Sequence, residues 1–193
     1  MATASTRWIV VGLGNPGEEY AATRHNVGAM LVEHIAESNS LRFSRHKSRN
    51  DVADLRLSNG SILVLTKPHS YMNTLGSNVR ALADFYSVAP EHVIACHDEL
   101  DIEFATLRVK LGGGENGHNG LKSITSALGS PDYYRIRLGI GRPPGRQDPA
   151  DFVLRKFSAN EREELPFFLE RSADALISLV SEGLSVTQSK FNS

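Results

Sequence analysis

The sequence predicts an α/β protein made of a single domain, residues 1–193, with a twisted mixed β-sheet of about six to seven strands flanked by helices. Three observations support this fold class. Apolar runs typical of buried strands alternate along the chain with segments of helical periodicity. Two β-like runs flank Asn59-Gly60, which is typical of an antiparallel hairpin. The length, 193 residues, suits one domain with a sizeable core.

The N-terminal quarter begins with a buried strand and a long loop. Trp8 to Val11 is a continuous apolar run that ends in glycine, so it predicts a central strand. Residues 12–26 carry Gly, Pro and Asn and indicate a loop. Asn26 is expected to cap a helix over residues 27–35, where apolar residues recur at helical spacing. Residues 40–50 are polar and basic and indicate a connection.

The middle of the chain contributes a hairpin, a helix and a second buried strand. Residues 51–57 and 61–66 are the two strands that flank Asn59-Gly60. Residues 75–87 place apolar side chains on one helical face. Residues 93–96 form an apolar run that ends at His97-Asp98-Glu99.

The remaining elements are, in order, a strand at 106–111, a glycine loop at 112–120, a helix at 121–128, a strand at 134–140, a Pro- and Gly-rich segment at 142–149, and a C-terminal amphipathic helix at about 160–184.

Composition limits the classes of partner. The 21 basic and 22 acidic residues nearly cancel, so any nucleic-acid contact must depend on a local patch and should be salt-sensitive. Cys96 is the only cysteine, which makes a disulfide framework impossible and fits a reducing cytosol. The polar N-terminus is followed by an apolar run too short for a signal peptide or membrane span. We therefore expect a cytoplasmic protein without a membrane partner.

The first loop contains a pattern associated with dinucleotides. Gly12-x-Gly14-x-x-Gly17 after a strand matches the G-x-G-x-x-G fingerprint. However, Pro16 and the polar stretch 18–24 delay the helix whose N-terminus would meet a pyrophosphate. An acidic residue that closes a second strand about 20 residues later is also missing, since Glu33 and Glu37 fall in a predicted helix. The context therefore favours no dinucleotide cofactor.

His25 and Asp98 are the candidates for acid–base chemistry. Taken singly, His25 is typical of a surface or helix-capping residue, and Asp98 of a loop acid. Because polar residues beyond the carboxyl ends of strands meet at one edge of an open α/β sheet, they can form a histidine base with an orienting carboxylate. Cys96 lies in an apolar run, and no G-x-S-x-G elbow is present. A water activated by histidine therefore fits better than a covalent route.

Three asparagines stand in other polar segments. Asn15, Asn73 and Asn119 are each compatible with an ordinary turn residue. As functional residues, they would supply neutral donors and acceptors that position a water molecule or stabilise an oxyanion.

Metal chemistry is an alternative use of the histidines. His25, His97, His118 and Asp98 could supply ligands. The sequence has neither H-x-x-x-H nor H-E-x-x-H spacing, which favours a site without metal.

Several basic residues are possible phosphate contacts, although each alone is more typical of a solvated surface. They are Lys67, Lys110, Lys122, Arg135, Arg137 and Arg142. Lys110 and Lys122 flank the glycine loop, whose backbone N–H groups could also meet a phosphate.

Four segments resemble, in order, the signature blocks of bacterial peptidyl-tRNA hydrolases. They are Val11–Gly17 with Tyr20 and Thr23–Gly28; Lys67-Pro68 with Tyr71-Met72-Asn73 and Gly76; His97–Asp101; and Gly112–Gly114 with Gly117–Leu121. The similarity spans roughly residues 7 to 160, and four long blocks in order are far more specific than one glycine pattern.

The resemblance implies a monomeric hydrolase without metal or cofactor. It implies cleavage of the ester between a peptide and the tRNA 3′ ribose, with the tRNA acceptor end and the nascent peptide as the bound groups. By the same resemblance, His25 is the catalytic base, Asp98 its partner, and Asn15 and Asn73 line the cleft around the ester.

Further roles follow from the matching blocks. His118 and Asn119 are expected to hold the peptide or the terminal adenosine, Tyr20 and Met72 to form cleft walls, and Lys110 and Arg137 to touch tRNA. Two alternatives stay open on the sequence alone. A nicotinamide-dependent enzyme would bind a dinucleotide, and a non-catalytic RNA-binding relative would not need the set of His25, Asp98 and Asn15.

Overall fold

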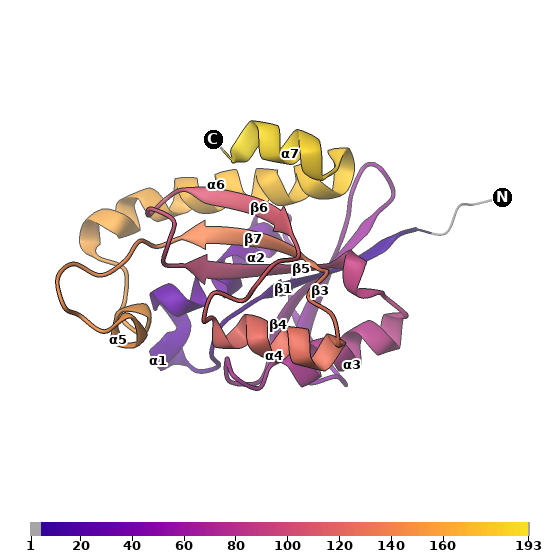
Figure 1. Ribbon diagram of the computed structural model, residues 1–193. Coiled ribbons are helices and arrows are strands. Elements are labelled where there is room, and N and C mark those ends of the chain that lie inside the picture. The colour runs from indigo at the N-terminus through magenta and orange to yellow at the C-terminus, as the bar shows by residue number, and fades with distance from the viewer. Residues whose placement is uncertain (1–4, 193) are drawn as a thin grey trace.

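The computed structural model describes residues 5–192, which form a seven-stranded mixed sheet (Figure 1). The strands are β1 (Arg7–Gly12), β2 (Ser44–His46), β3 (Asn50–Arg56), β4 (Ile62–Pro68), β5 (Val93–Glu99), β6 (Leu107–Leu111) and β7 (Tyr134–Gly139). Their order is β2-β3-β4-β1-β5-β7-β6. The four central strands are parallel, whereas β2, β3 and β6 pair antiparallel at the two edges. The predicted α/β class with a mixed sheet is confirmed.

Helices cover both faces of this sheet. They are α1 (Glu18–Ala21), α2 (Val27–Ser38), α3 (Gly76–Tyr86), α4 (Asn119–Leu128), α5 (Pro149–Val153), α6 (Ala159–Glu182) and α7 (Leu184–Phe191), with 3₁₀ turns η1 (Arg24–Asn26) and η2 (Pro90–His92). Helices α2 and α6 bury one core against the sheet, and α3 and α4 bury a second core against the other face (Figure 1). Each strand of the parallel centre is therefore apolar on both sides, which explains the continuous apolar runs.

Three predicted boundaries are wrong, each where a non-local partner decides. The connection at 40–50 contains the edge strand β2, and the loop at 12–26 contains α1 and η1. Strand β5 does not end at Cys96 but continues through Glu99, and all seven of its residues are buried. Its polar end can stay in the sheet because side chains from other segments bind Asp98 and Glu99, while the His97 ring bonds to the backbone oxygen of the neighbouring Asp98.

One close approach brings the beginning of α2 against β5. Gly28 lies so near the strand that a Cβ on it would stand 2.0 Å from the backbone oxygen of Cys96. Only glycine permits this contact. Since η1 directly precedes α2, the approach also carries His25 to the carboxyl end of β5.

The C-terminal helices close the fold above β6. Helix α6 begins with a capping box formed by Ser158 and Glu161. After α7, the side chain of Asn192 accepts from the Val109 N–H at 2.7 Å and donates to the Val109 carbonyl at 2.9 Å. These bonds satisfy backbone groups on an edge strand, a position that would otherwise invite pairing with another chain.

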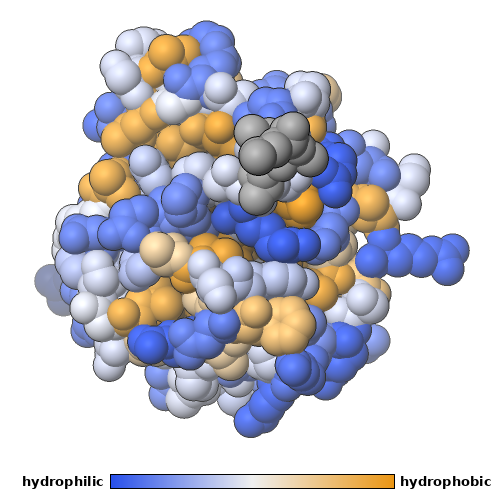
Figure 2. Space-filling model, turned by 90° about the vertical axis from the view of Figure 1, so that its right-hand side faces the viewer, coloured by the Kyte–Doolittle hydropathy of each residue, from blue (hydrophilic) through white to orange (hydrophobic). Residues whose placement is uncertain are grey.

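Figure 2 shows the end of the molecule at which the parallel strands begin, where apolar residues are scattered among hydrophilic ones. No helix within residues 5–192 combines the length and apolar character that crossing a membrane requires.

Candidate active site

A cavity of about 490 Å³ opens at the carboxyl ends of the parallel strands. Its lining residues come from loops and helix ends that are distant in sequence: Asn15, His25, Tyr71, Met72, Asn73, Asp98, Glu99, Leu100, Asn116, Gly117, His118, Asn119, Pro149, Ala150, Val153 and Leu154. The structure thus gathers seven of the ten predicted site residues in one cavity. Tyr20, Lys110 and Arg137 are not among its lining residues.

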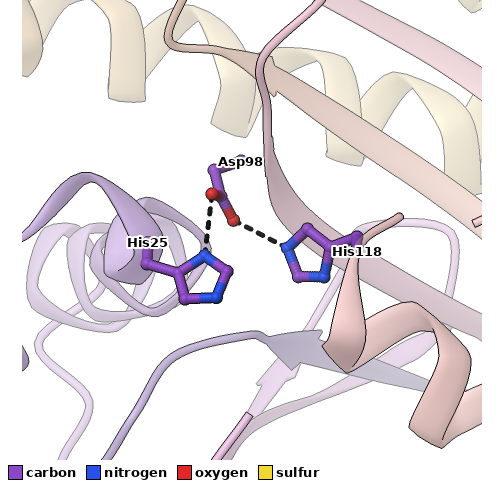
Figure 3. Close-up of side chains that lie close together, drawn as sticks. All are labelled: His25, Asp98 and His118. Carbon is purple, nitrogen blue, oxygen red and sulfur yellow. Dashed lines mark hydrogen bonds and ion pairs between the residues drawn. The ribbon is translucent and has the colours of Figure 1, made fainter. Parts of the chain in front are cut away.

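His25 and Asp98 meet at the base of this cavity. The His25 Nδ1 lies 2.8 Å from the Asp98 Oδ2, and the carboxylate is almost completely buried (Figure 3). Because a carboxylate only accepts hydrogen bonds, Nδ1 carries the proton of a neutral ring. The other ring nitrogen, Nε2, is then unprotonated and able to accept a proton.

His118 binds the second oxygen of the same carboxylate. Its Nε2 lies 2.7 Å from the Asp98 Oδ1 (Figure 3). Its Nδ1 accepts from the backbone N–H groups of Gly120 and Leu121 and so caps helix α4. Both contacts require the proton on Nε2, which fixes the tautomer. Asp98 therefore accepts from two histidines. The sequence placed His25, Asp98 and His118 in polar segments but did not indicate that both histidines bind the same carboxylate.

Electrostatics favour an ionised Asp98 and a proton-accepting His25. Burial opposes charge on the Asp98 carboxyl, but His25 and His118 outweigh it and hold its pKa well below the usual range. Burial lowers the pKa of His25, yet the charge and hydrogen bond of Asp98 reverse this effect, so the net pKa lies above its ordinary value.

The same three side chains have the composition of a metal site. One ligand atom from each of His25, Asp98 and His118 lies within 4.8 Å of the others. A histidine that binds a metal usually donates its second ring N–H to a neighbour. His118 instead accepts two backbone N–H bonds at Nδ1, so the nitrogen facing Asp98 is protonated. This pattern fits a hydrogen-bonded network better than a metal centre.

His97 lies behind this network rather than in the cavity wall. Its Nδ1 donates to the backbone oxygen of Asp98 at 2.8 Å, and its ring stands edge-on to His118 with centroids 5.1 Å apart. Burial, together with the nearby His118, lowers the pKa of His97 to about 3. The ring is therefore neutral near pH 7 and fills space behind His118.

Asn15 is held from two directions. Its backbone N–H donates to the Asn26 Oδ1 at 2.9 Å, and its carbonyl accepts from the Asn26 Nδ2 at 3.0 Å. Its own Oδ1 accepts from the Met72 N–H at 2.7 Å. The Asn15 Nδ2 group is then the part of the amide that can donate to a substrate. Asn26 occupies the N-cap position of α2, as predicted, but its side chain makes no capping bond and holds Asn15 instead.

Two walls of the cavity differ from expectation. Tyr20 stands behind the wall, edge-on to the half-exposed Tyr71 with ring centroids 6.2 Å apart. An apolar wall formed by α5 and Leu154 was missed by the sequence analysis. The signal was present in Asp148-Pro149, since Asp148 accepts from the Ala150 N–H and Pro149 occupies the first helical turn.

The basic residues on β6 and β7 lie beside the cavity. Arg137 forms an ion pair with the lining residue Glu99 at 3.4 Å. Burial and the charges of Arg137 and Arg135 lower the pKa of Lys110. Arg135 is fully buried and donates to the carbonyls of Gly113 and Gly114, so it holds the glycine loop. The prediction that Arg135 is a possible phosphate contact is therefore wrong.

The sequence and the fold are similar to those of known proteins. A family model described as "Peptidyl-tRNA hydrolase" matches residues 9–193. A "Peptidyl-tRNA hydrolase" of Frankia alni is 55% identical over 185 residues, covering 96% of this chain and 93% of the relative. One of Streptomyces coelicolor is 54% identical over 195 residues and covers 98% and 97%. The crystal structure of peptidyl-tRNA hydrolase from Acinetobacter baumannii superposes with a TM-score of 0.87 at 33% identity, covering 98% and 96%.

Proposed function

The chain belongs to the peptidyl-tRNA hydrolase family and hydrolyses peptidyl-tRNA, and we propose that His25 activates the water molecule that attacks the ester. The observation that carries this proposal is the bond between the His25 Nδ1 and the Asp98 Oδ2, which leaves Nε2 as the proton acceptor. A base at this position can take a proton from water as the water attacks the carbonyl carbon.

The reaction then follows ester hydrolysis. The attacking water forms the new C–O bond and gives its proton to His25, and the resulting imidazolium is stabilised by Asp98. The tetrahedral intermediate collapses with loss of the tRNA 3′ oxygen, which takes a proton from the imidazolium or from solvent. The products are free tRNA and a peptide with a free carboxylate. General-base assistance of this kind contributes about 10²–10⁴-fold.

Neutral amide groups are proposed to stabilise, by hydrogen bonds, the negative charge that develops on the carbonyl oxygen. Asn15 supports this role because its side-chain oxygen is occupied by Met72, which leaves Nδ2 to donate. Asn73 and Asn119 line the same cavity and supply further amide groups. A well-placed donor of this type contributes about 10²–10³-fold. Together with His118, these residues would also orient the peptide or the terminal adenosine.

Other roles follow as proposals. Met72, with Tyr71 backed by Tyr20, forms one wall for the substrate, and Lys110 and Arg137 contact the tRNA.

The reaction proceeds without a metal or cofactor, because the histidine tautomers that bind Asp98 already complete the hydrogen-bonded network. Burial raises the pKa of the Cys96 thiol, which argues against a covalent route through this residue. We also propose that the protein acts as a monomer in the cytoplasm, where ribosomes produce peptidyl-tRNA.

Incubation with an N-blocked aminoacyl-tRNA tests this assignment. We expect release of the blocked amino acid at the same rate with and without a strong metal chelator. His25→Ala should lower kcat by about 10²–10⁴-fold while tRNA binding survives. Near-normal turnover by His25→Ala would exclude this histidine as the base, and loss of activity with chelator would indicate a metal centre.

A further inference from the structure

A cationic turn joins β2 to β3 at the active-site end of the sheet. This segment, residues 45–49, is called the basic turn here and exposes Arg45, Lys47 and Arg49. Asn50, the first residue of β3, pairs with Pro68, the last residue of β4. The basic turn therefore lies beside the carboxyl end of a parallel strand, the end at which the cavity opens.

The basic turn is fixed in place by buried hydrogen bonds. Arg49 has the left-handed backbone conformation, with φ at 63°, which is uncommon for a residue other than glycine. Its carbonyl accepts from the His69 N–H at 2.9 Å and from the Asn78 Nδ2 at 2.7 Å. The fully buried Asn50 side chain donates to the Asn78 carbonyl at 3.0 Å. The turn thus presents its side chains on a rigid support.

The charge of the basic turn is only partly neutralised. Asp51 lies 3.2 Å from Arg45 and 2.6 Å from His69, and Glu33 is paired with Lys67. Among residues 5–192, Lys47 and Arg49 take part in no ion pair. Across the cavity, Arg137 is paired with Glu99 and Arg142 with Asp101, whereas Lys110 has no ion-pair partner within residues 5–192. The basic turn therefore holds two exposed cations, Lys47 and Arg49, whose charges no ion pair offsets.

An aromatic ring stands next to these cations. Phe85 is 49% exposed, and the Lys47 Nζ lies 4.6 Å from its ring centre. The His46 ring meets it edge-on, with centroids 4.6 Å apart. Cations combined with an exposed aromatic ring are typical of surfaces that bind flexible nucleic-acid strands, where phosphates meet the charges and bases stack on the ring.

A second cavity lies between the basic turn and the active-site cavity. This cavity of about 230 Å³ is lined by Asp51 and His69 next to the turn and by Asn15, which also lines the active site. Tyr71 of the active-site wall is two residues beyond His69, at most about 8 Å along the chain. Resting on the proposed function, we propose that the basic turn binds backbone phosphates of the tRNA whose 3′ end occupies the active site.

The test removes two charges without disturbing the turn. Lys47→Gln and Arg49→Asn are combined, because asparagine tolerates the left-handed conformation of position 49. The control variant, Arg171→Gln with Lys190→Gln, removes two charges from α6 and α7. KM is measured for an N-blocked aminoacyl-tRNA and for an N-blocked aminoacyl ester of adenosine, at several salt concentrations.

We expect the double variant to raise KM for the full tRNA substrate about tenfold relative to its KM for the adenosine ester. The slope of log affinity for tRNA against log salt should become shallower by about 1–2. The control variant should match the unmodified protein, and Lys47→Arg with Arg49→Lys should restore KM. Equal KM ratios and salt slopes in the double variant and the control would overturn the proposal while leaving the hydrolase assignment intact. Failure of the unmodified protein to hydrolyse either substrate would instead refute the hydrolase function and, with it, this proposal.

Discussion

His25 and Asp98 are 73 positions apart in the sequence, yet their side chains lie 2.8 Å apart at Nδ1 and Oδ2. Gly28 supports this contact by letting the beginning of α2 pack directly on the backbone of β5 at Cys96. The contact has measurable consequences for the pH dependence, the tautomer and the folding stability of the protein.

The pH dependence of kcat/KM should show an acid limb above the ordinary pKa of histidine, about 6.5. The net effect of burial and Asp98 raises the pKa of His25, and only the neutral ring can accept a proton. The rate should therefore fall as the pH drops through this raised pKa and level off above it. A pH–rate profile from pH 5 to 9 measures the limb, and a rate independent of pH across this range would contradict the assignment of the base.

Asp98→Asn should slow the reaction by about 10²–10⁴-fold, since an amide at this position can donate to Nδ1 and favour the wrong tautomer. The acid limb of the remaining activity should also move to lower pH, because burial still lowers the pKa of His25 while the carboxylate no longer raises it. If the acid limb of the pH–rate profile lies at the same pH in Asp98→Asn, Asp98 does not raise the pKa of His25.

His118→Ala should affect both stability and catalysis. Loss of the helix cap costs about 1 kcal/mol, and the buried Asp98 loses one of its two donors. His118→Asn is the informative companion, because asparagine caps a helix well but is too short to reproduce the reach of the imidazole to Asp98. Compared with His118→Ala, His118→Asn should recover more of the unfolding temperature than of kcat. Equal recovery of both quantities would show that His118 acts only as a helix cap.

Asn26→Ala should lower kcat/KM even under conditions in which the variant is fully folded. The substitution removes both hydrogen bonds that hold the Asn15 backbone. Displacement of a substrate-positioning group by about 1 Å can cost about 10²-fold in rate. Asn26→Asp keeps the acceptor for the Asn15 N–H and should retain intermediate activity. Unchanged kinetics in the alanine variant would remove Asn15 from the proposed machinery.

Gly28→Ala should destabilise the fold by about 1–3 kcal/mol, as expected for overpacking, because the new Cβ would stand 2.0 Å from the Cys96 carbonyl oxygen. The relief of this clash should move α2 and η1 away from β5 and lower the activity of the folded protein as well. Gly114→Ala is the control for stability, since a Cβ at that position meets nothing within 4 Å. Denaturant unfolding compares the two variants, and equal stability would contradict the close packing of α2.

Much of the fold could be predicted from local pattern. Apolar runs and apolar–polar alternation located six of the seven strands, and helical periodicity located α2, α3, α4 and α6. The edge strand β2 escaped because its three residues are polar or basic and are strand only through pairing with β3. Likewise, α5 is short, and its one buried residue, Phe152, packs against Arg24 of η1, which is 128 positions away in the sequence.

The sequence by itself determined the α/β class, the order of the main elements and the residue types offered for catalysis. These depend on hydrophobic periodicity and on turn chemistry, which act between near neighbours. Only the tertiary structure decided that Asp98 accepts from two histidines, that Asn26 clamps Asn15, and that Tyr20 stands behind Tyr71. Such contacts join segments far apart in the chain, and their geometry depends on strand register and on how closely α2 packs against β5.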